Sequence, residues 1–397
     1  MMSLVGDTVL TLPSFLYSSM ETTKKLISNM LKEARSRPIR NLSHDILSAV
    51  QPHIHSWTKS YGMNFLQWSK LRKLSNHAFH GDNLKSMIPD MIASSEMMLE
   101  GWKKNDGKEI EVYEQFRLCT SEVISRTAFG SCYLEGKNIF DMLLKLSSVI
   151  VRNSHKLRVP GIIKVYKTTT GVIFLECFLK AHHGANDKQR ISVNELVEEC
   201  KTFYFAGQDT TNSLLVWTVF LLALHMDWQE EARKEVLQLF GKETPNPDGL
   251  AKLKTMSMII NESLRLYPPI ISLTRKVDKE VRLENLIVPT NVELLVPNLA
   301  LHHEPQFWGQ DVKRFKPERF SEGVANATNN NMAAFLPFGM GSRTCVGFNF
   351  ATIEAKIALL MILQRYSFTL SPDYVHSPFQ IITVRPQHGL QIILHSL

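Results

Sequence analysis

The sequence predicts a mainly α protein with a minor β-sheet. Apolar residues recur at three- and four-residue spacing through most of residues 21–150, residues 192–226 form one long helical run, and short β-rich segments are confined to the last third of the chain. With 397 residues, 44% of them hydrophobic and 21% charged, the chain has the composition of a globular enzyme with a large core.

The longest predicted helix is "SVNELVEECKTFYFAGQDTTNSLLVWTVFLLALHM". It begins at Ser192, with Glu195 three positions later as a capping box. Its second half is apolar on all faces, which is typical of a helix through the middle of a domain. Further amphipathic helices are expected at about 227–240 and 249–267, the second stopped by Pro268–Pro269.

The remaining elements are assigned from shorter patterns. Residues 153–190 indicate an irregular, loop-rich passage. Short strands fit residues 275–297, and "NFATIEAKIALLMILQRYSF" (349–368) predicts a strong helix. The chain closes with the strand-like segments "FQIITVRP" and "GLQIILHSL".

Composition excludes several classes of function. The net charge of +7 comes from scattered Lys and Arg, without a basic stripe interleaved with aromatics, so we expect no nucleic-acid partner. Five widely spaced cysteines form no disulfide framework and indicate a reducing compartment. The longest uncharged run near the N-terminus, residues 8–20, is too short for a bilayer helix of about 20 residues and lacks a basic flank, so neither an anchor nor a signal peptide is expected.

One cysteine lies in a glycine-punctuated turn just before an apolar helix, in "FLPFGMGSRTCVGFNF". Glycines at 339, 341 and 347 permit tight backbone and close approach of amide N–H groups. A helix starting after Cys345 is expected to stabilise its thiolate. Arg343 can pair with a carboxylate of a cofactor, and Phe338 can shield the sulfur. Such a thiolate is a soft ligand suited to haem iron; the alternative is a buried structural cysteine.

A second unusual segment is "AGQDTT" inside the long helix. An acid, Asp209, and a hydroxyl, Thr210, are costly among apolar residues unless they are used. Gly207 is expected to leave room for a ligand against the helix backbone. The Thr210 hydroxyl can bend the helical hydrogen bonds, and Asp209 can pass protons to it. The alternative is an ordinary helix break capped by Asp209 or Thr210.

Two further patterns are weak when taken alone. In "NESLRLYPP", Glu262 and Arg265 lie one turn apart and can form an ion pair, which on its own is a common surface feature. In "QWSKLRKLSNHAFH", Trp68 and Arg72 also lie one turn apart, as many amphipathic helices allow. The latter helix is basic, as would suit an acidic protein partner.

Taken together, these segments identify a family. The string Phe338-x-x-Gly341-x-Arg343-x-Cys345-x-Gly347 resembles, position for position, the haem-binding loop of the cytochrome P-450 superfamily. The segments "AGQDTT", "ESLR", "FKPERF" and "WSKLR" resemble that family's other motifs in their order. The likeness runs from about residue 68 to residue 397. It is nearest to plant microsomal members of the clan with steroid, gibberellin and terpenoid hydroxylases.

The resemblance implies a cytochrome P-450 fold and a role for each matching residue. Haem b would be the cofactor, with its iron bound by the Cys345 thiolate. Asp209 and Thr210 would deliver protons on the catalytic side. The haem and its propionates would be contacted by Phe338, Gly341, Arg343, Gly347, Trp68, Arg72 and Arg275. A buried network would support the cysteine loop structurally: Glu262, Arg265 and Arg319.

The same resemblance implies the reaction and its partners. The enzyme would insert one oxygen atom from O2 into a lipophilic small molecule. Electrons would come from a separate NADPH–cytochrome P-450 reductase, since the chain has no flavin or dinucleotide motif. Full-length relatives would be associated with the endoplasmic reticulum membrane, facing the cytosol.

The chain departs from the family pattern in its length. We expect residues 1–66 to be a helical N-terminal remnant that forms a single domain with a haem-binding core at 67–397. No room is left before Trp68 for the first sheet strands, and residues 153–190 are too short for the usual roof of the substrate pocket. Two alternatives follow: a catalytically inactive remnant, and a haem-thiolate isomerase or dehydratase that needs no O2. The presence of Asp209 and Thr210 in the long helix argues against the isomerase or dehydratase.

Overall fold

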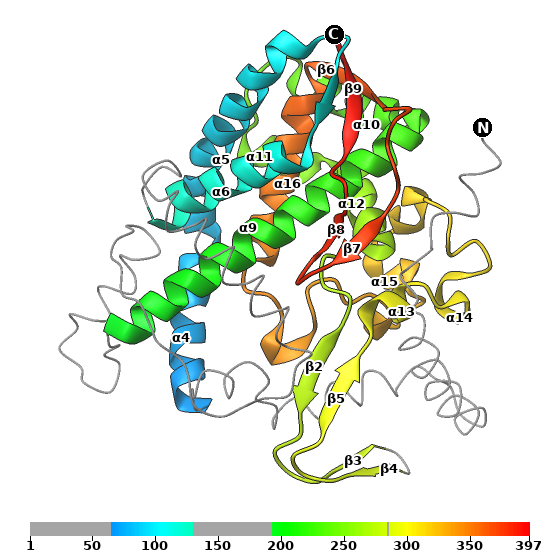
Figure 1. The fold of residues 1–397 in the computed structure, drawn as a ribbon. Helices are drawn as coiled ribbons and strands as arrows, with labels where there is room; N and C mark the ends of the chain where they lie inside the picture. The colour runs from blue at the N-terminus through cyan, green and yellow to red at the C-terminus, as the bar shows by residue number, and fades with distance from the viewer. Residues whose placement is uncertain (1–64, 130–192, 284–285) are drawn as a thin grey trace.

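The computed structural model describes residues 65–129, 193–283 and 286–397, which form a helical core with small antiparallel sheets along it (Figure 1). The predicted fold class is therefore confirmed. The longer helices are α4 (Phe65–Ala78), α5 (Gly81–Trp102), α6 (Tyr113–Phe129), α9 (Val193–Leu224), α10 (Met226–Phe240), α12 (Lys254–Leu266) and α16 (Phe348–Leu363). Residues 1–64, residues 153–190 and Ser192 of the predicted capping box lie outside the described residues, and the domain division at residue 66, which falls within α4, stays a prediction.

Helices α9 and α16 form the centre of the core. Figure 1 shows α9 running diagonally across the molecule; α6, α12 and α16 pack with it, and α5 packs with α6 and α16. From residue 211 to residue 223 every side chain of α9 is buried. Residues 357–363 of α16 are each at most 2% exposed. Residues 357–363 of α16 and 214–223 of α9, apart from Thr218, are apolar on all faces, which explains why these stretches are surrounded by protein rather than lying at the surface.

The helix predicted at 249–267 is instead two helices, α11 (Pro247–Lys252) and α12. They break at Leu253, whose ψ of 88° is not helical. The carboxylate of Glu235, on α10, accepts hydrogen bonds from the backbone N–H groups of Lys254, Thr255 and Met256. It satisfies three donors that a helix start leaves without partners. Because this cap comes from a distant residue, local periodicity could not show the break.

The minor β-structure consists of several small antiparallel sheets rather than one. The strands are β1 (Glu109–Glu111), β2 (Leu273–Lys276), β3 (Val281–Leu283), β4 (Leu286–Val288), β5 (Glu293–Val296), β6 (Tyr366–Leu370), β7 (Pro378–Gln380), β8 (Val384–Pro386) and β9 (Gln391–Ser396). The largest sheet has the order β1-β9-β6, and the others pair β2 with β5, β3 with β4, and β7 with β8. The predicted strands within 275–297 are confirmed.

Two boundaries differ from the sequence prediction. The helix expected through residue 368 ends at Leu363, and β6 begins at Tyr366. There Tyr366 and Phe368 are buried while Ser367 between them is less so, which is a strand's period of two. The segment "FQIITVRP" is not one strand but a hairpin, in which Ile381 N–H donates to the Thr383 carbonyl at the turn.

Shorter elements join these units. They are η3 (Lys103–Asn105), α13 (Asn298–His302), α14 (Pro305–Trp308), η4 (Pro317–Phe320), α15 (Gly323–Ala327), η5 (Met332–Ala334) and η6 (Gly341–Arg343). Within the part of the chain that the structure describes, no helix combines the length and the apolar character needed to cross a bilayer.

The Glu235 cap gives a first test of this fold. Replacing Glu235 with Ala should lower the free energy of unfolding by about 1–2 kcal/mol, because three N–H groups at the start of α12 lose a charged acceptor. Urea unfolding followed by circular dichroism measures the change. The matched control is Glu231→Ala on the same helix, whose side chain is 58% exposed and pairs only with Lys234. Equal losses in the two variants would contradict the capping role.

Candidate functional site

The turn around Cys345 is folded tightly by its own backbone. Gly339 and Gly341 have φ values of +70° and +79°, in the left-handed region that side chains disfavour. The N–H of Cys345 donates to the carbonyl of Phe338 at 2.8 Å, which closes the turn. The Phe338 ring packs edge-on against Phe348 at the start of α16, with ring centroids 4.7 Å apart. The cysteine is thus held by residues on both sides of it.

Cys345 as a residue is exposed to solvent. Burial of the thiol by the surrounding protein nevertheless raises its pKa, while the Gly347 N–H and the charge of Arg72 act in the opposite direction. The expectation of a stabilised thiolate is therefore wrong for the protein alone, because desolvation outweighs both. A bound metal cation would change this balance, since a coordinating thiol is deprotonated.

Three arginines surround the same turn. Arg72 comes from α4, Arg275 from β2 and Arg343 from the turn itself. The Arg343 guanidinium lies over the Trp68 ring, 3.4 Å from its centroid, so α4 covers the turn directly. Burial and the charges of Arg275 and Arg72 lower the pKa of Arg343 to about 10. The turn, α4 and β2 thus place like charges close together, an arrangement that a bound anion would stabilise.

The polar segment of α9 has its own set of contacts. The Thr210 hydroxyl donates to the Ala206 carbonyl at 2.6 Å, as a hydroxyl that bends a helix is expected to do. Asp209 Oδ2 accepts a hydrogen bond from the Thr383 hydroxyl at 2.7 Å. The prediction that Gly207 leaves room for a ligand is wrong. A Cβ there would lie 2.9 Å from Ile124, so this glycine lets α6 approach α9.

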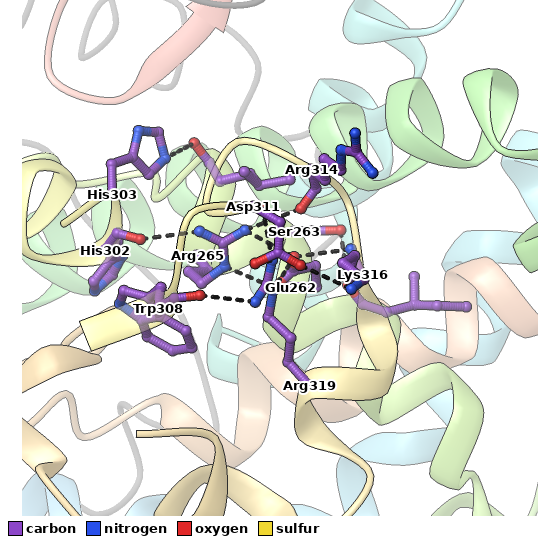
Figure 2. Close-up of polar contacts among 12 residues, drawn as sticks. Glu262, Ser263, Arg265, His302, His303, Trp308, Asp311, Arg314, Lys316 and Arg319 are labelled. Atoms are coloured by element: carbon purple, nitrogen blue, oxygen red, sulfur yellow. Dashed lines mark hydrogen bonds and ion pairs between the residues drawn. The ribbon is translucent and has the colours of Figure 1, made fainter. Parts of the chain in front are cut away.

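The residues Glu262 and Arg265 form a fully buried ion pair rather than a surface pair (Figure 2). Arg265 Nε and Nη2 donate to the two carboxylate oxygens of Glu262 at 2.7 and 2.8 Å. Glu262 also accepts from the Lys316 backbone N–H at 2.9 Å, and Arg319 Nε lies 3.5 Å from its carboxylate. The structure therefore brings together the predicted trio.

The network around this ion pair reaches the segment that precedes the cysteine turn. Arg265 Nη1 donates to the backbone carbonyl of His302 at 3.0 Å. The ring Nε2 of His302 accepts from the backbone N–H of Leu336 at 2.8 Å, and the Leu336 carbonyl accepts from Gly339 N–H. A path of hydrogen bonds therefore runs from the ion pair to the first glycine of the turn. These hydrogen bonds are the physical basis of the predicted support for the cysteine loop.

A family match accords with this geometry. The family model described as cytochrome P-450 matches residues 20–169 and 164–393, which is most of the chain. The chain belongs to the cytochrome P-450 family. It is an oxidoreductase of the monooxygenase type, in a family whose members carry haem iron on a cysteine thiolate.

Similar proteins come from plants. The chain is 50% identical to cytochrome P-450 CYP749A22 of Panax ginseng, over 96% of this chain and 88% of the relative. It is 40% identical to a 7-deoxyloganic acid hydroxylase of Catharanthus roseus, over 83% of this chain and 71% of the relative. It is also 40% identical to an 11-oxo-beta-amyrin 30-oxidase of Medicago truncatula, over 90% and 77%.

These comparisons confirm that the chain is short within the aligned region. The alignment with the ginseng protein spans 468 positions and the chain has 397 residues, so at least 71 positions of the relative have no counterpart here. The predicted places of this shortening, before Trp68 and within 153–190, lie outside the described residues and stay predictions. The division at residue 66 stays a prediction as well.

Several residues of this region were not predicted. His302 ends the short helix α13 beside His303, and no motif of the sequence marks either residue. Thr383 and Arg385 lie in a segment that the sequence indicates only as a strand. Tyr113 opens α6 and carries no motif. The signal that could have found them is tertiary. His302 bonds to Arg265 and Thr383 bonds to Asp209, whereas Arg385 and Tyr113 bond to each other and are linked to Asp209 by electrostatics.

The buried ion pair predicts a large effect on stability. Replacing Glu262 with Gln should lower the free energy of unfolding by about 3–5 kcal/mol. The buried Arg265 keeps its positive charge, but the neutral amide of Gln no longer balances that charge. Urea unfolding measures the loss. The control is Glu100→Gln, which breaks another i,i+3 pair whose side chains are more than half exposed and should change little. A loss below about 1 kcal/mol at Glu262 would refute the structural role.

The buried histidine predicts a dependence of stability on pH. Burial, His303 and Arg265 lower the pKa of His302 to about 3, whereas an unfolded histidine titrates near its ordinary value of about 6.5. The unfolded chain therefore takes up the proton first, so stability is full above about pH 6.5 and falls as the pH drops toward 3. One such group contributes a slope of about 1.4 kcal/mol per pH unit.

Urea unfolding of the parent at pH 7, 6 and 5 measures this slope. His302→Gln should have a shallower slope by about that amount, whatever its stability at pH 7. The exposed His395, replaced in the same way, serves as the control and should leave the slope unchanged. An unchanged slope in His302→Gln would show that this histidine is not held neutral in the folded protein.

Proposed function

We propose that this chain is a haem-thiolate hydroxylase in which Cys345 binds the iron of haem b. The observation that carries the proposal is the meeting of three separate segments at the cysteine turn: α4 with Trp68 and Arg72, β2 with Arg275, and the turn with Arg343. They combine one soft ligand with a rim of cations. Haem needs such a combination, because it has an iron centre and two carboxylates.

The described residues fit the cofactor in both of these respects. Cys345 is an exposed residue, and the Gly347 N–H and Arg72 favour the charged form of its thiol. The mutual repulsion of Arg72, Arg275 and Arg343 would be relieved by the propionate groups. The turn residues Phe338, Gly341 and Gly347 would shape the cofactor's thiolate side. When bound, the haem iron supplies the activation of O2.

The polar segment of α9 would supply protons. Thr210 is anchored to the Ala206 carbonyl, and Asp209 is held by Thr383. Burial raises the pKa of Asp209 above its ordinary value, against the effects of Thr383 and Arg385. A carboxyl group with a raised pKa carries a proton at higher pH and is suited to a general acid. We assign proton donation to Asp209 and the positioning of a proton acceptor to Thr210.

The remaining features of the proposal concern partners and substrate. We propose that electrons arrive from an NADPH–cytochrome P-450 reductase, which the basic helix α4 would attract through Lys70, Arg72 and Lys73. The substrate would be a lipophilic small molecule that receives one oxygen atom of O2, as the hydroxylase and oxidase names of the relatives suggest. The site of action would be the cytosolic face of the endoplasmic reticulum membrane, the usual place of such enzymes in plants.

The ligand assignment is tested by spectroscopy. The protein, expressed with haem supply, reduced and exposed to carbon monoxide, should show the red-shifted Soret band of a thiolate-bound haem. Cys345→Ala should lose this band completely. Cys200→Ala, which removes a half-buried cysteine on α9, should keep it.

Each result separates the candidate functions. A retained band in Cys345→Ala would overturn the ligand assignment. Folded parent protein that lacks the band would favour the inactive-remnant interpretation, which the 71 or more missing aligned positions support. A band together with product formation that needs neither NADPH nor O2 would indicate the isomerase or dehydratase.

A further inference from the structure

The β7–β8 hairpin is attached to the middle of α9 by hydrogen bonds. The Val384 carbonyl accepts from the Ser213 hydroxyl at 2.6 Å and from Trp217 Nε1 at 2.9 Å. The Val384 N–H donates to the Pro269 carbonyl at 3.1 Å, just after α12. The residues Asp209, Ser213 and Trp217 are spaced by four, so they share one face of α9. The hairpin therefore lies on the face of α9 that carries Asp209.

This attachment places the Thr383 hydroxyl against the Asp209 carboxyl group. Thr383 is 2% exposed, and its hydroxyl donates to Asp209 Oδ2 at 2.7 Å. The turn of the hairpin is closed without that hydroxyl, because the Ile381 N–H bonds to the backbone carbonyl of Thr383. The side chain is therefore not needed to close the turn, and its hydrogen bond goes to α9 instead.

A cation and a phenol complete the surroundings of the acid. Arg385, two residues beyond Thr383, donates from Nη1 to the Tyr113 hydroxyl at 3.3 Å, and its guanidinium lies 5.9 Å from the centroid of that ring. The charge of Asp209 acts on Tyr113, and that of Arg385 acts on Asp209. Thus α6 supplies Tyr113, β8 supplies Arg385, and the turn between β7 and β8 supplies Thr383.

We propose that the β7–β8 hairpin is part of the proton-delivery apparatus, in which Thr383 orients the Asp209 carboxyl through its hydrogen bond and Arg385 keeps positive charge beside it. Thr383 and Arg385 are positioning residues, since they act through Asp209. The inference rests on the proposed function, because it assumes that Asp209 is the proton donor.

The electrostatics of the group agree with this role. Burial raises the pKa of Asp209, and both Thr383 and Arg385 lower it. Without them the carboxyl would hold its proton more tightly and would be a weaker acid. If the protonated acid is the donor, the rate falls as the pH rises through the pKa of Asp209. Loss of Thr383 then moves that fall to higher pH and lowers the maximal rate.

The direct test is the titration of the carboxyl in the haem-containing protein. Infrared difference spectra between the parent and Asp209→Asn identify the C=O band of protonated Asp209, and its intensity against pH gives the midpoint. In Thr383→Val, which replaces the hydroxyl with a methyl group of similar size, we expect a midpoint at higher pH and a shifted band. Thr383→Ser restores the hydroxyl and should return both to the parental values.

Turnover gives the second readout. With NADPH consumption and product both measured, Thr383→Val should form product about tenfold more slowly, with Thr383→Ser within about twofold of the parent. Its pH profile should move in the same direction as the infrared midpoint. The control Ser213→Ala removes one bond from α9 to the hairpin but leaves the Trp217 bond and the Thr383 hydroxyl, so it should keep the parental midpoint.

The outcomes are decisive in either direction. An unchanged band and midpoint in Thr383→Val overturn the proposal, as does an equal shift in Ser213→Ala, which would mean that only the docking of the hairpin matters. If Thr383→Val does not fold, Arg385→Gln must still raise the midpoint. Because the infrared titration needs no turnover, a protein without monooxygenase activity can still support the contact between Thr383 and Asp209, and the two failures stay distinguishable.

Discussion

The buried Glu262–Arg265 ion pair is the interaction on which the placement of the cysteine turn depends. Two charges without solvent need partners in strict geometry, and α12 alone supplies only one bidentate contact. The remaining groups come from later segments, among them the His302 carbonyl and the Lys316 N–H. Satisfying one charge pair thus ties down the chain between His302 and Lys316, in addition to the burial of Trp308, Val312 and Phe315 in the core. His302 connects this network to the cysteine turn, because its ring Nε2 accepts a hydrogen bond from the Leu336 N–H.

Helix α9 joins the core to the polar part of the site. It packs with α6 and α16, and its second half is buried. Gly207 allows α6 to approach α9 closely at Ile124. Tyr113, at the start of α6, lies within the electrostatic influence of Asp209 on α9. The space that the sequence predicts for a ligand at Gly207 is occupied by the Ile124 side chain.

Much of the fold could be predicted because its signals are local. The apolar periodicity of α9 and α16, the Pro268–Pro269 stop and the strands after it depend on residues close in sequence. The break at Leu253 could not be predicted, because its cap comes from Glu235 on another helix. The strand at Tyr366 was hidden by the preceding apolar helix. In both cases a distant partner decides between two locally acceptable conformations.

The site shows the same division. Its motifs named residues that the structure does bring together, including Trp68 with Arg343 and Glu262 with Arg265. Periodicity and spacing contain no information about Thr383, which reaches Asp209 across 174 positions. They also wrongly predict a stabilised Cys345 thiolate, because desolvation by the surrounding fold raises the pKa of this thiol.

The predicted shortening of the chain would affect substrate recognition more than it affects cofactor binding. The contacts of Trp68 with Arg343, of Arg265 with His302 and of Thr383 with Asp209 are all made between residues that the structure describes. The proposed binding of the cofactor and the proposed delivery of protons would use these contacts. Recognition of a substrate needs a roof over the site, where the sequence predicts the loss. Cofactor binding can therefore persist in a chain whose choice of substrate has changed, and the two must be measured separately.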